Sequence, residues 1–166
     1  MKSFFVFAFA AILLAGLTAC SRKDPAAAES HQHKHDHKHQ HEHHAPHGGT
    51  VVVLGKEVYH LELVRDAAAG TLTAYVLDGE MEKFIRIAAP AIELETTVAG
   101  TPRKLVLTAT ANAMTGETVG DTSQFTAQAD WLKEVAGFDA VIPLLEVRGV
   151  KFSAVAFNFP KGNDTH

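Results

Sequence analysis

Residues 57–78 read EVYHLELVRDAAAGTLTAYVLD, and this stretch decides the fold class. Within residues 57–66, apolar and polar side chains alternate at Tyr59-His60-Leu61-Glu62-Leu63, as in a β-strand with one buried face. Residues 67–70 (AAAG) end in a glycine that suits a turn, and residues 71–78 form a second β-type run. The two runs therefore predict an antiparallel β-hairpin.

Short β-type segments recur from residue 48 to residue 160, without long helical segments between them. This length supports one hydrophobic core. The pattern favours a single all-β domain, an antiparallel β-sandwich or barrel of about eight or nine strands. Arg148-Gly149 is expected to connect the last two strands as a compact hairpin, and residues 161–166 to form a disordered tail. The other predicted strands are residues 50–54, 84–88, 92–98, 104–110, 123–127, 140–147 and 150–159.

One short helix is expected at residues 130–135. Asp130 is a suitable N-cap, and Gly137 is a suitable residue to close the helix. Three aromatic side chains are expected to anchor the core around it: Phe125, Trp131 and Phe138.

The strand at residues 57–66 carries two candidate ligands. Tyr59, Leu61 and Leu63 share one face, which we expect to be the core, so His60 and Glu62 share the other. An imidazole and a carboxylate two residues apart can both ligate one metal ion, and His47 could complete such a site. The alternative is that His60 simply pairs with Glu62 on an exposed strand face.

The segment before the domain is rich in histidine. Residues 31–47 hold nine of the eleven histidines, mostly at every second position and separated by polar residues. Imidazole is the commonest protein ligand for borderline divalent metals, and such a polar run cannot bury itself. We therefore expect residues 20–47 to be a disordered, metal-binding tether; the alternatives are a passive linker or an expression tag. The predicted ligands are His31, His33, His35, His37, His39, His41, His43, His44 and His47.

The first nineteen residues have the pattern of a signal peptide. Lys2 precedes an apolar stretch, residues 4–17, which is too short to span a bilayer comfortably. Leu17-Thr18-Ala19-Cys20 resembles the lipobox of bacterial lipoproteins, which implies cleavage before Cys20 and acylation of that residue, the only cysteine. The mature protein is then expected to be anchored to an envelope membrane facing the periplasm. Ser21 favours the outer membrane in a Gram-negative cell, and an ordinary secretory signal is the alternative.

The charge of the domain and the motifs it lacks restrict the classes of function that we expect. Residues 48–166 carry ten basic and fifteen acidic side chains, so nucleic acid is not an expected partner. Asp78, Glu80 and Glu82 form an acidic stretch that suits a solvated turn, with metal binding as the alternative. Neither a GxSxG elbow nor a phosphate-binding glycine loop is present, and we expect no enzyme. A catalytic role would require a deep pocket with polar groups around His60.

The chain resembles a small domain of His-rich bacterial envelope lipoproteins and is similar to the His-rich leading region of some heavy-metal efflux adaptors. It lacks the adaptors' long coiled-coil hairpin and lipoyl-like domains. The resemblance implies a small all-β module for metal handling. It rests on HGGTVV at 47–52, YHLEL at 59–63, the pattern GxLxxYVLD at 70–78, SQF at 123–125, Trp131-Leu132, FDAV at 138–141 and VRGVKF at 147–152.

Together these observations predict a lipid-anchored envelope protein that binds or buffers a divalent transition metal. Zinc is the first choice, followed by nickel, copper(II) and cobalt. The alternative is a protein-interaction module for a metal efflux or uptake component, with the histidine run as a spacer.

Overall fold

The computed structural model describes residues 44–164, and these residues form an antiparallel β-barrel with one short helix. The signal peptide, Cys20 and the histidines from His31 to His43 lie outside the described residues. The elements are β1 (Thr50–Leu54), β2 (Tyr59–Asp66), β3 (Thr71–Asp78), β4 (Ala91–Val98), β5 (Thr101–Ala109), β6 (Gln124–Gln128), α1 (Trp131–Glu134), β7 (Phe138–Val147) and β8 (Val150–Phe159).

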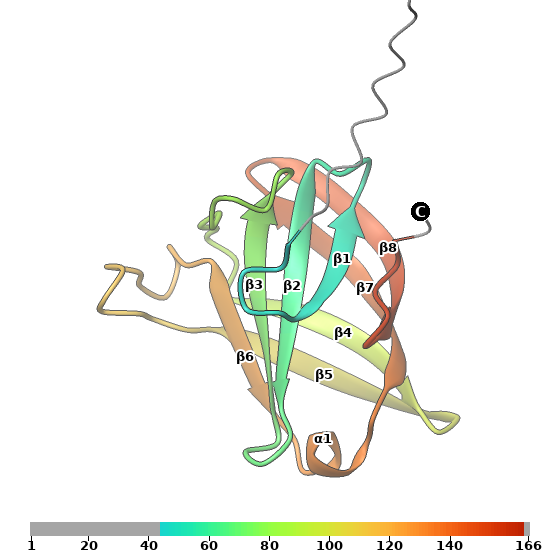
Figure 1. Ribbon diagram of the computed structural model, residues 1–166. Coiled ribbons are helices and arrows are strands. Elements are labelled where there is room, and N and C mark those ends of the chain that lie inside the picture. The colour runs from blue at the N-terminus through green and yellow to red at the C-terminus, as the bar shows by residue number, and fades with distance from the viewer. Residues whose placement is uncertain (1–43, 165–166) are drawn as a thin grey trace, which may run out of the picture. The chain divides into compact units, whose positions relative to one another are not determined.

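All eight strands belong to one sheet in the order β1-β2-β3-β6-β5-β4-β7-β8, with antiparallel neighbours throughout. The sheet curls until β1 and β8 come into contact, so the barrel is nearly closed (Figure 1). The all-β prediction is confirmed in its barrel form. The predicted β2–β3 hairpin is also present, with Asp66 paired to Thr71 across the turn.

The barrel interior holds the hydrophobic core. Leu61 and Leu63 of β2 are buried, and Tyr59 packs against them at the edge of the core, as the alternation of β2 predicts. Phe125 and Phe138 are also buried, which confirms their role as core anchors.

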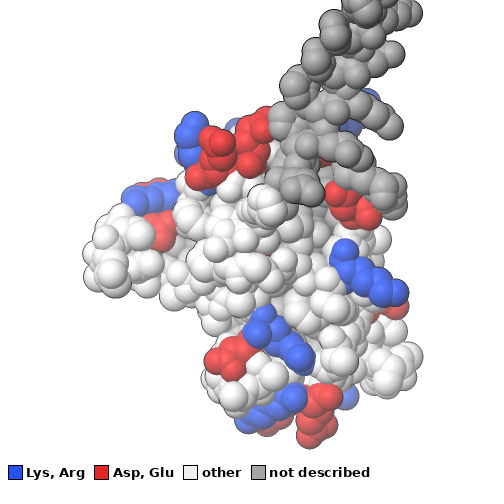
Figure 2. Space-filling view, viewed as in Figure 1, with Lys and Arg blue, Asp and Glu red and all other residues white. Residues whose placement is uncertain are grey.

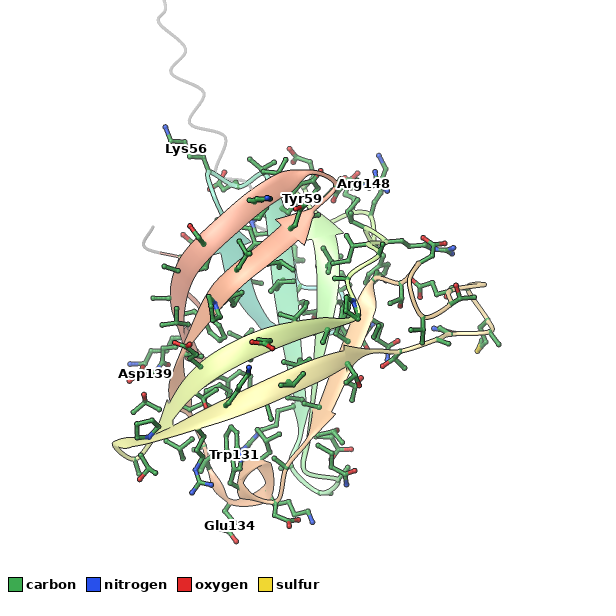
Figure 3. The ribbon with its side chains drawn as sticks, turned by 180° about the vertical axis from the view of Figure 1, so that it is seen from behind. Lys56, Tyr59, Trp131, Glu134, Asp139 and Arg148 are labelled. Atoms are coloured by element: carbon green, nitrogen blue, oxygen red, sulfur yellow. The ribbon has the colours of Figure 1, made fainter. Side chains whose placement is uncertain are left out.

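Helix α1 closes one end of the barrel. Leu132 is fully buried, and the Trp131 ring meets the Phe138 ring edge-on, with centroids 5.4 Å apart. In Figure 3, Trp131 lies at this end, whereas Tyr59 and Arg148 lie at the opposite end. Arg65 Nη1 donates hydrogen bonds to the carbonyl oxygens of Leu132 and Val135, which ties the helix to β2.

One of the two predicted helix caps is confirmed. Asp130 is the N-cap residue of α1, but its side chain makes no capping hydrogen bond, and its Oδ1 accepts instead from Lys133 Nζ at 2.9 Å. The prediction that Gly137 closes the helix is wrong, because the C-cap is Val135. Gly137 has another role: a Cβ atom there would lie 2.5 Å from the carbonyl oxygen of Phe159. Only glycine therefore allows this close approach to β8.

The predicted strand at residues 84–88 is also wrong. Phe84 and Ile87 make only isolated bridges, to Leu77 and Thr122 respectively. Phe84 bridges to β3, whereas Ile87 bridges to the residues just before β6. The segment therefore changes partner along its length, and no continuous ladder forms.

The end of the chain completes the barrel. The Thr50 hydroxyl donates to the Pro160 carbonyl oxygen at 3.1 Å. The Asn163 amide accepts from Val53 N at 2.7 Å and donates to Val53 O at 3.2 Å, so it takes the place of a strand partner along β1. Residues 161–164, part of the expected disordered tail, are therefore held on the domain.

Pro143 lies within β7, beyond the end of its ladder with β4. That ladder joins only residues 95–97 with residues 139–141, and Pro143, which has no N–H to donate, comes two residues later. On the β8 side, Val147 and Val150 pair around Arg148 (φ 49°) and Gly149 (φ 84°), which confirms the predicted two-residue turn.

No helix within residues 44–164 is long and apolar enough to cross a membrane.

Candidate metal centre

The last histidine of the run lies in a tight turn immediately before β1. Gly48 N donates to the Ala45 carbonyl oxygen at 2.9 Å, which closes a β-turn with Pro46 and His47 at its centre. Proline presets the backbone for the first central position, and Gly48 follows with a φ of 68°. In Figure 1 this segment crosses in front of β2 before the chain enters β1.

The turn lies over a buried carboxylate. Glu62 on β2 is 0% exposed, and its Oε1 accepts hydrogen bonds from His47 N at 2.7 Å and Gly49 N at 2.9 Å. Its Oε2 lies 2.8 Å from Nδ1 of the His47 ring. Three donors from residues 47–49 thus converge on one carboxylate, which compensates for the cost of burying it.

Gly49 makes this approach sterically possible. A Cβ atom at this position would lie 2.6 Å from the Leu63 carbonyl oxygen and 2.8 Å from Glu62 Cγ. Any larger residue at position 49 would push the segment away from β2, so Gly49 is a structural requirement of the contact.

The His47 ring packs against two aromatic rings, those of Tyr75 and Phe84. It stacks on Tyr75, with centroids 4.1 Å apart and an interplanar angle of 19°, and lies 5.7 Å from the Phe84 ring. Tyr75 is the direct cross-strand neighbour of Glu62. Burial and, secondarily, the negative charge of Glu62 raise the pKa of the Tyr75 phenol. Tyr75 therefore stays neutral beside the carboxylate and serves as a stacking surface.

The contact with Glu62 bears on the tautomer of His47. A carboxylate in its ionised form only accepts hydrogen bonds, so this contact pairs it with the tautomer that carries a proton on Nδ1 and a lone pair on Nε2. The side chain is 39% exposed. A carboxylate that holds the far nitrogen of a ligating histidine is a common outer-shell arrangement at metal sites.

The strand face of His60 and Glu62 is not exposed, contrary to the alternative interpretation. Both side chains are fully buried, and residues 47–49 lie against Glu62. His60 Nδ1 lies 3.2 Å from the Asp78 carbonyl oxygen, whereas Glu62 is bonded to His47 and Gly49. Within residues 44–164, no three histidine, cysteine or acidic side chains are grouped so as to hold a metal ion. The candidate set of His47, His60 and Glu62 is not brought together as a ligand group there.

The acidic stretch after β3 is organised as a turn. Asp78 Oδ1 accepts from the backbone N–H groups of Glu82, at 2.9 Å, and Lys83, at 3.1 Å. Met81, with a φ of 57°, is buried at the centre of this turn. These bonds support the turn interpretation of this stretch.

Sequence reasoning did not find a second buried carboxylate, Glu117. Its Oε1 accepts from the Ser123 hydroxyl at 2.6 Å and from Ser123 N at 3.0 Å, and its Oε2 accepts from the Thr115 hydroxyl. Burial raises the pKa of Glu117, but these hydrogen bonds and the nearby Arg86 lower it further than burial raises it. The network stiffens the arm of residues 110–122, which projects from the barrel in Figures 1 and 3.

Among the cavities of residues 44–164, two shallow ones lie away from this turn. One, of about 420 Å³, is lined by residues such as Glu95, Asp139 and Asn163. The other, of about 460 Å³, lies between residues 86–91 and the β7–β8 turn, beyond the end of the β4–β7 ladder. His60 lines neither of them.

Surface charge is mixed on the face shown in Figure 2. Acidic and basic side chains lie beside one another around a broad uncharged area.

No family model, curated protein or solved structure matches this chain.

Sequence reasoning also missed Tyr75 and Phe84 as neighbours of His47. An aromatic residue at an outward-facing position of β3, opposite Glu62, is the signal that could have indicated Tyr75. Phe84 gave no such signal, because it comes from the segment that does not form the predicted strand.

Proposed function

We propose that this protein is a lipid-anchored envelope protein that binds or buffers divalent transition metal through residues 31–47. The sequence supports this with nine histidines in that run, separated by side chains that cannot bury themselves. Neutral imidazoles bind such ions in pairs or threes, and a run with many overlapping ligand sets exchanges metal rapidly.

The observation that carries the proposal is the contact between His47 and Glu62. A histidine that merely belonged to a spacer would need no buried carboxylate behind it. Here the run ends in a ring whose Nδ1 is held at 2.8 Å from a fully buried Glu62, which leaves Nε2 as the nitrogen to ligate.

Zinc is the first candidate ion, followed by nickel, copper(II) and cobalt. Intrinsic affinity for nitrogen ligands favours copper(II), so supply in the envelope decides which ion is bound. Imidazole must be deprotonated to bind metal, and binding is therefore expected to weaken as the medium becomes acidic.

Cys20 supplies the proposed anchor. Acylation at this position would hold the histidine run close to a membrane, where tethering raises the local concentration of metal near a membrane partner. Substitution Cys20→Ser is expected to abolish the incorporation of labelled palmitate and to release the protein from the membrane fraction. Unchanged labelling would contradict the anchor.

The metal proposal is tested by calorimetric titration with zinc. The matched variant replaces the eight histidines from His31 to His44 with glutamine, the residue already present at positions 32 and 40, and keeps His47. We expect the original protein to bind several zinc ions and the variant at most one. Equal stoichiometry in the two proteins would refute the proposal.

A second candidate function, docking of a metal efflux or uptake component, has its own support. Met114 is 97% exposed on the arm that the Glu117 network stiffens, and Leu144 is 58% exposed beside the cavity beyond Pro143. Co-purification of such a component in amounts unchanged by chelator and by the glutamine variant would favour docking over metal binding.

A further inference from the structure

We propose that the gap between β4 and β7 is a docking site for an extended segment of a partner protein, which joins the barrel as an added strand. The segment carries an acidic side chain four residues before an apolar one. This inference goes beyond the proposed function, and it holds whether or not the histidine run binds metal.

The strands β4 and β7 are joined along only part of their length. Their ladder covers residues 95–97 and 139–141, and beyond it the two strands diverge from the region of Asp139 towards Arg148 (Figure 3). The cavity of about 460 Å³ lies in this gap, between residues 86–91 and the end of β7. Because strands of one barrel bound the gap on both sides, it admits a single extended chain rather than the edge of another folded sheet.

The second half of β7 has an unused hydrogen-bonding edge. In a two-residue hairpin the pair that flanks the turn is hydrogen-bonded, and here this pair is Val147 with Val150. Leu145, two residues earlier, therefore also directs its backbone N–H and C=O groups towards β8. Leu144 and Glu146 direct theirs away from β8, into the gap. In the described part of the chain, no ladder or isolated bridge pairs these two residues on that side.

The facing edge of β4 is unused in the same way. The β4–β5 turn is also a two-residue hairpin, with Val98 paired to Thr101. Counting back from this pair leaves Ala91 and Glu93 with backbone groups directed away from β5, and the β4–β7 ladder stops before it reaches them. Unpaired strand edges are templates for pairing with another chain, and main-chain hydrogen bonds supply the affinity when a peptide adds to them.

An exposed cation at the rim of the cavity indicates the charge of the added segment. Arg148 is exposed and forms no ion pair with any side chain of residues 44–164. Arg86, which also lines the cavity, already donates hydrogen bonds to the arm of residues 110–122. Arg148 is therefore the cation that remains for a carboxylate of the partner.

The register of the added strand follows from the side chains of β7. Leu144 is 58% exposed, and Glu146 lies 3.8 Å from Lys151 Nζ, which offsets its charge. In an antiparallel pair the directly opposite side chains contact one another. A segment antiparallel to β7, as all neighbouring strands of this sheet are, therefore places an acidic residue opposite Arg148 and, four residues later, an apolar residue opposite Leu144.

The experiment selects ligands from a displayed library of random linear peptides on the purified full chain. A chelator is present throughout, so that the histidine run holds no metal. We expect the selected peptides to carry Asp or Glu four residues before an apolar residue. Fluorescence anisotropy with the synthetic peptides then gives their dissociation constants.

Substitutions separate this edge from other surfaces. Leu144→Asp and Arg148→Glu should each weaken the selected peptides by about 10-fold or more, because each places a negative charge against the segment. The matched controls Val106→Asp and Arg103→Glu make the same changes at exposed positions of β5 and should alter binding by less than about 2-fold. Methylation of the backbone nitrogens of a selected peptide removes main-chain donors while keeping every side chain, and it should abolish binding.

Hydrogen exchange gives a second readout that needs no variant. The N–H groups of Leu144 and Glu146 should exchange rapidly in the free protein and become protected when a selected peptide is bound. Selection of no peptide with a dissociation constant below about 100 μM, or unchanged exchange at both residues, would overturn the inference. So would peptides that bind all four variants and the original protein equally. A dimer of the free protein that Leu144→Asp dissociates would assign the edge to a second copy of the chain and would also overturn it.

Discussion

Removal of the buried carboxylate by Glu62→Ala should destabilise the metal-free domain substantially. The side chain accepts three hydrogen bonds, from His47 N, Gly49 N and His47 Nδ1. After truncation, the partly exposed ring can turn to water, but the two backbone N–H groups lie partly buried over β2. Hydrogen bonds to a charged acceptor contribute about 1.5–3 kcal/mol each, and a buried unsatisfied donor costs about 1–3 kcal/mol.

The net effect is smaller than the sum of these terms, because the variant no longer pays for desolvating a carboxylate. We expect a loss of about 2–4 kcal/mol in the free energy of unfolding, measured by urea denaturation without metal. Glu93→Ala is the matched control. Glu93 lies 2.7 Å from Lys104 Nζ but is 52% exposed, so its loss should cost less than about 1 kcal/mol. Equal losses in the two variants would refute the reasoning that burial makes Glu62 important.

Three further predictions concern the rest of the barrel. Phe125→Ala, which empties a fully buried position, should cost about 3–5 kcal/mol in urea denaturation, and a loss below about 1 kcal/mol would contradict the assigned core. Asn163→Ala should accelerate hydrogen exchange at the Val53 amide, whose bond it removes; unchanged exchange would show that the amide does not hold the edge of β1. Because the folded-state pKa of Glu117 is lowered, its contribution to stability is complete above its ordinary pKa of 4.5 and is lost as the pH falls through the folded-state pKa. The urea midpoint should therefore fall more steeply in the original protein than in Glu117→Gln between about pH 5 and about pH 3, and parallel curves would contradict this.

The fold class could be predicted because β-alternation is a local property. Residues 59–63 alternate as a strand with one core face does, and Leu61 and Leu63 do lie in the barrel interior. The turn at Arg148-Gly149 was equally local, since two residues with positive φ are what a tight hairpin needs. The strand predicted at residues 84–88 failed because strand formation also needs a partner along its whole length, which a short apolar run does not specify.

The candidate site could be predicted only in part. The histidine run and Glu62 are visible in the sequence, but alternation alone does not reveal that residues 47–49 lie over the outer face of β2 and bury it. The partnership of His47 with Glu62 depends on the turn at Ala45–Gly48 and on the space that Gly49 leaves. Asn163 was missed for the same reason, because its contact with Val53 spans 110 residues of sequence.

The most direct test of the central claim is the metal content of the protein purified without an affinity tag from cells supplied with several transition metals. Elemental analysis should find zinc, or another ion of the same class, at more than one equivalent per chain. The variant in which the histidines from His31 to His44 are replaced by glutamine should hold at most one. A metal content below about a tenth of an equivalent in the original protein, or one equal to that of the variant, would contradict metal binding by the histidine run.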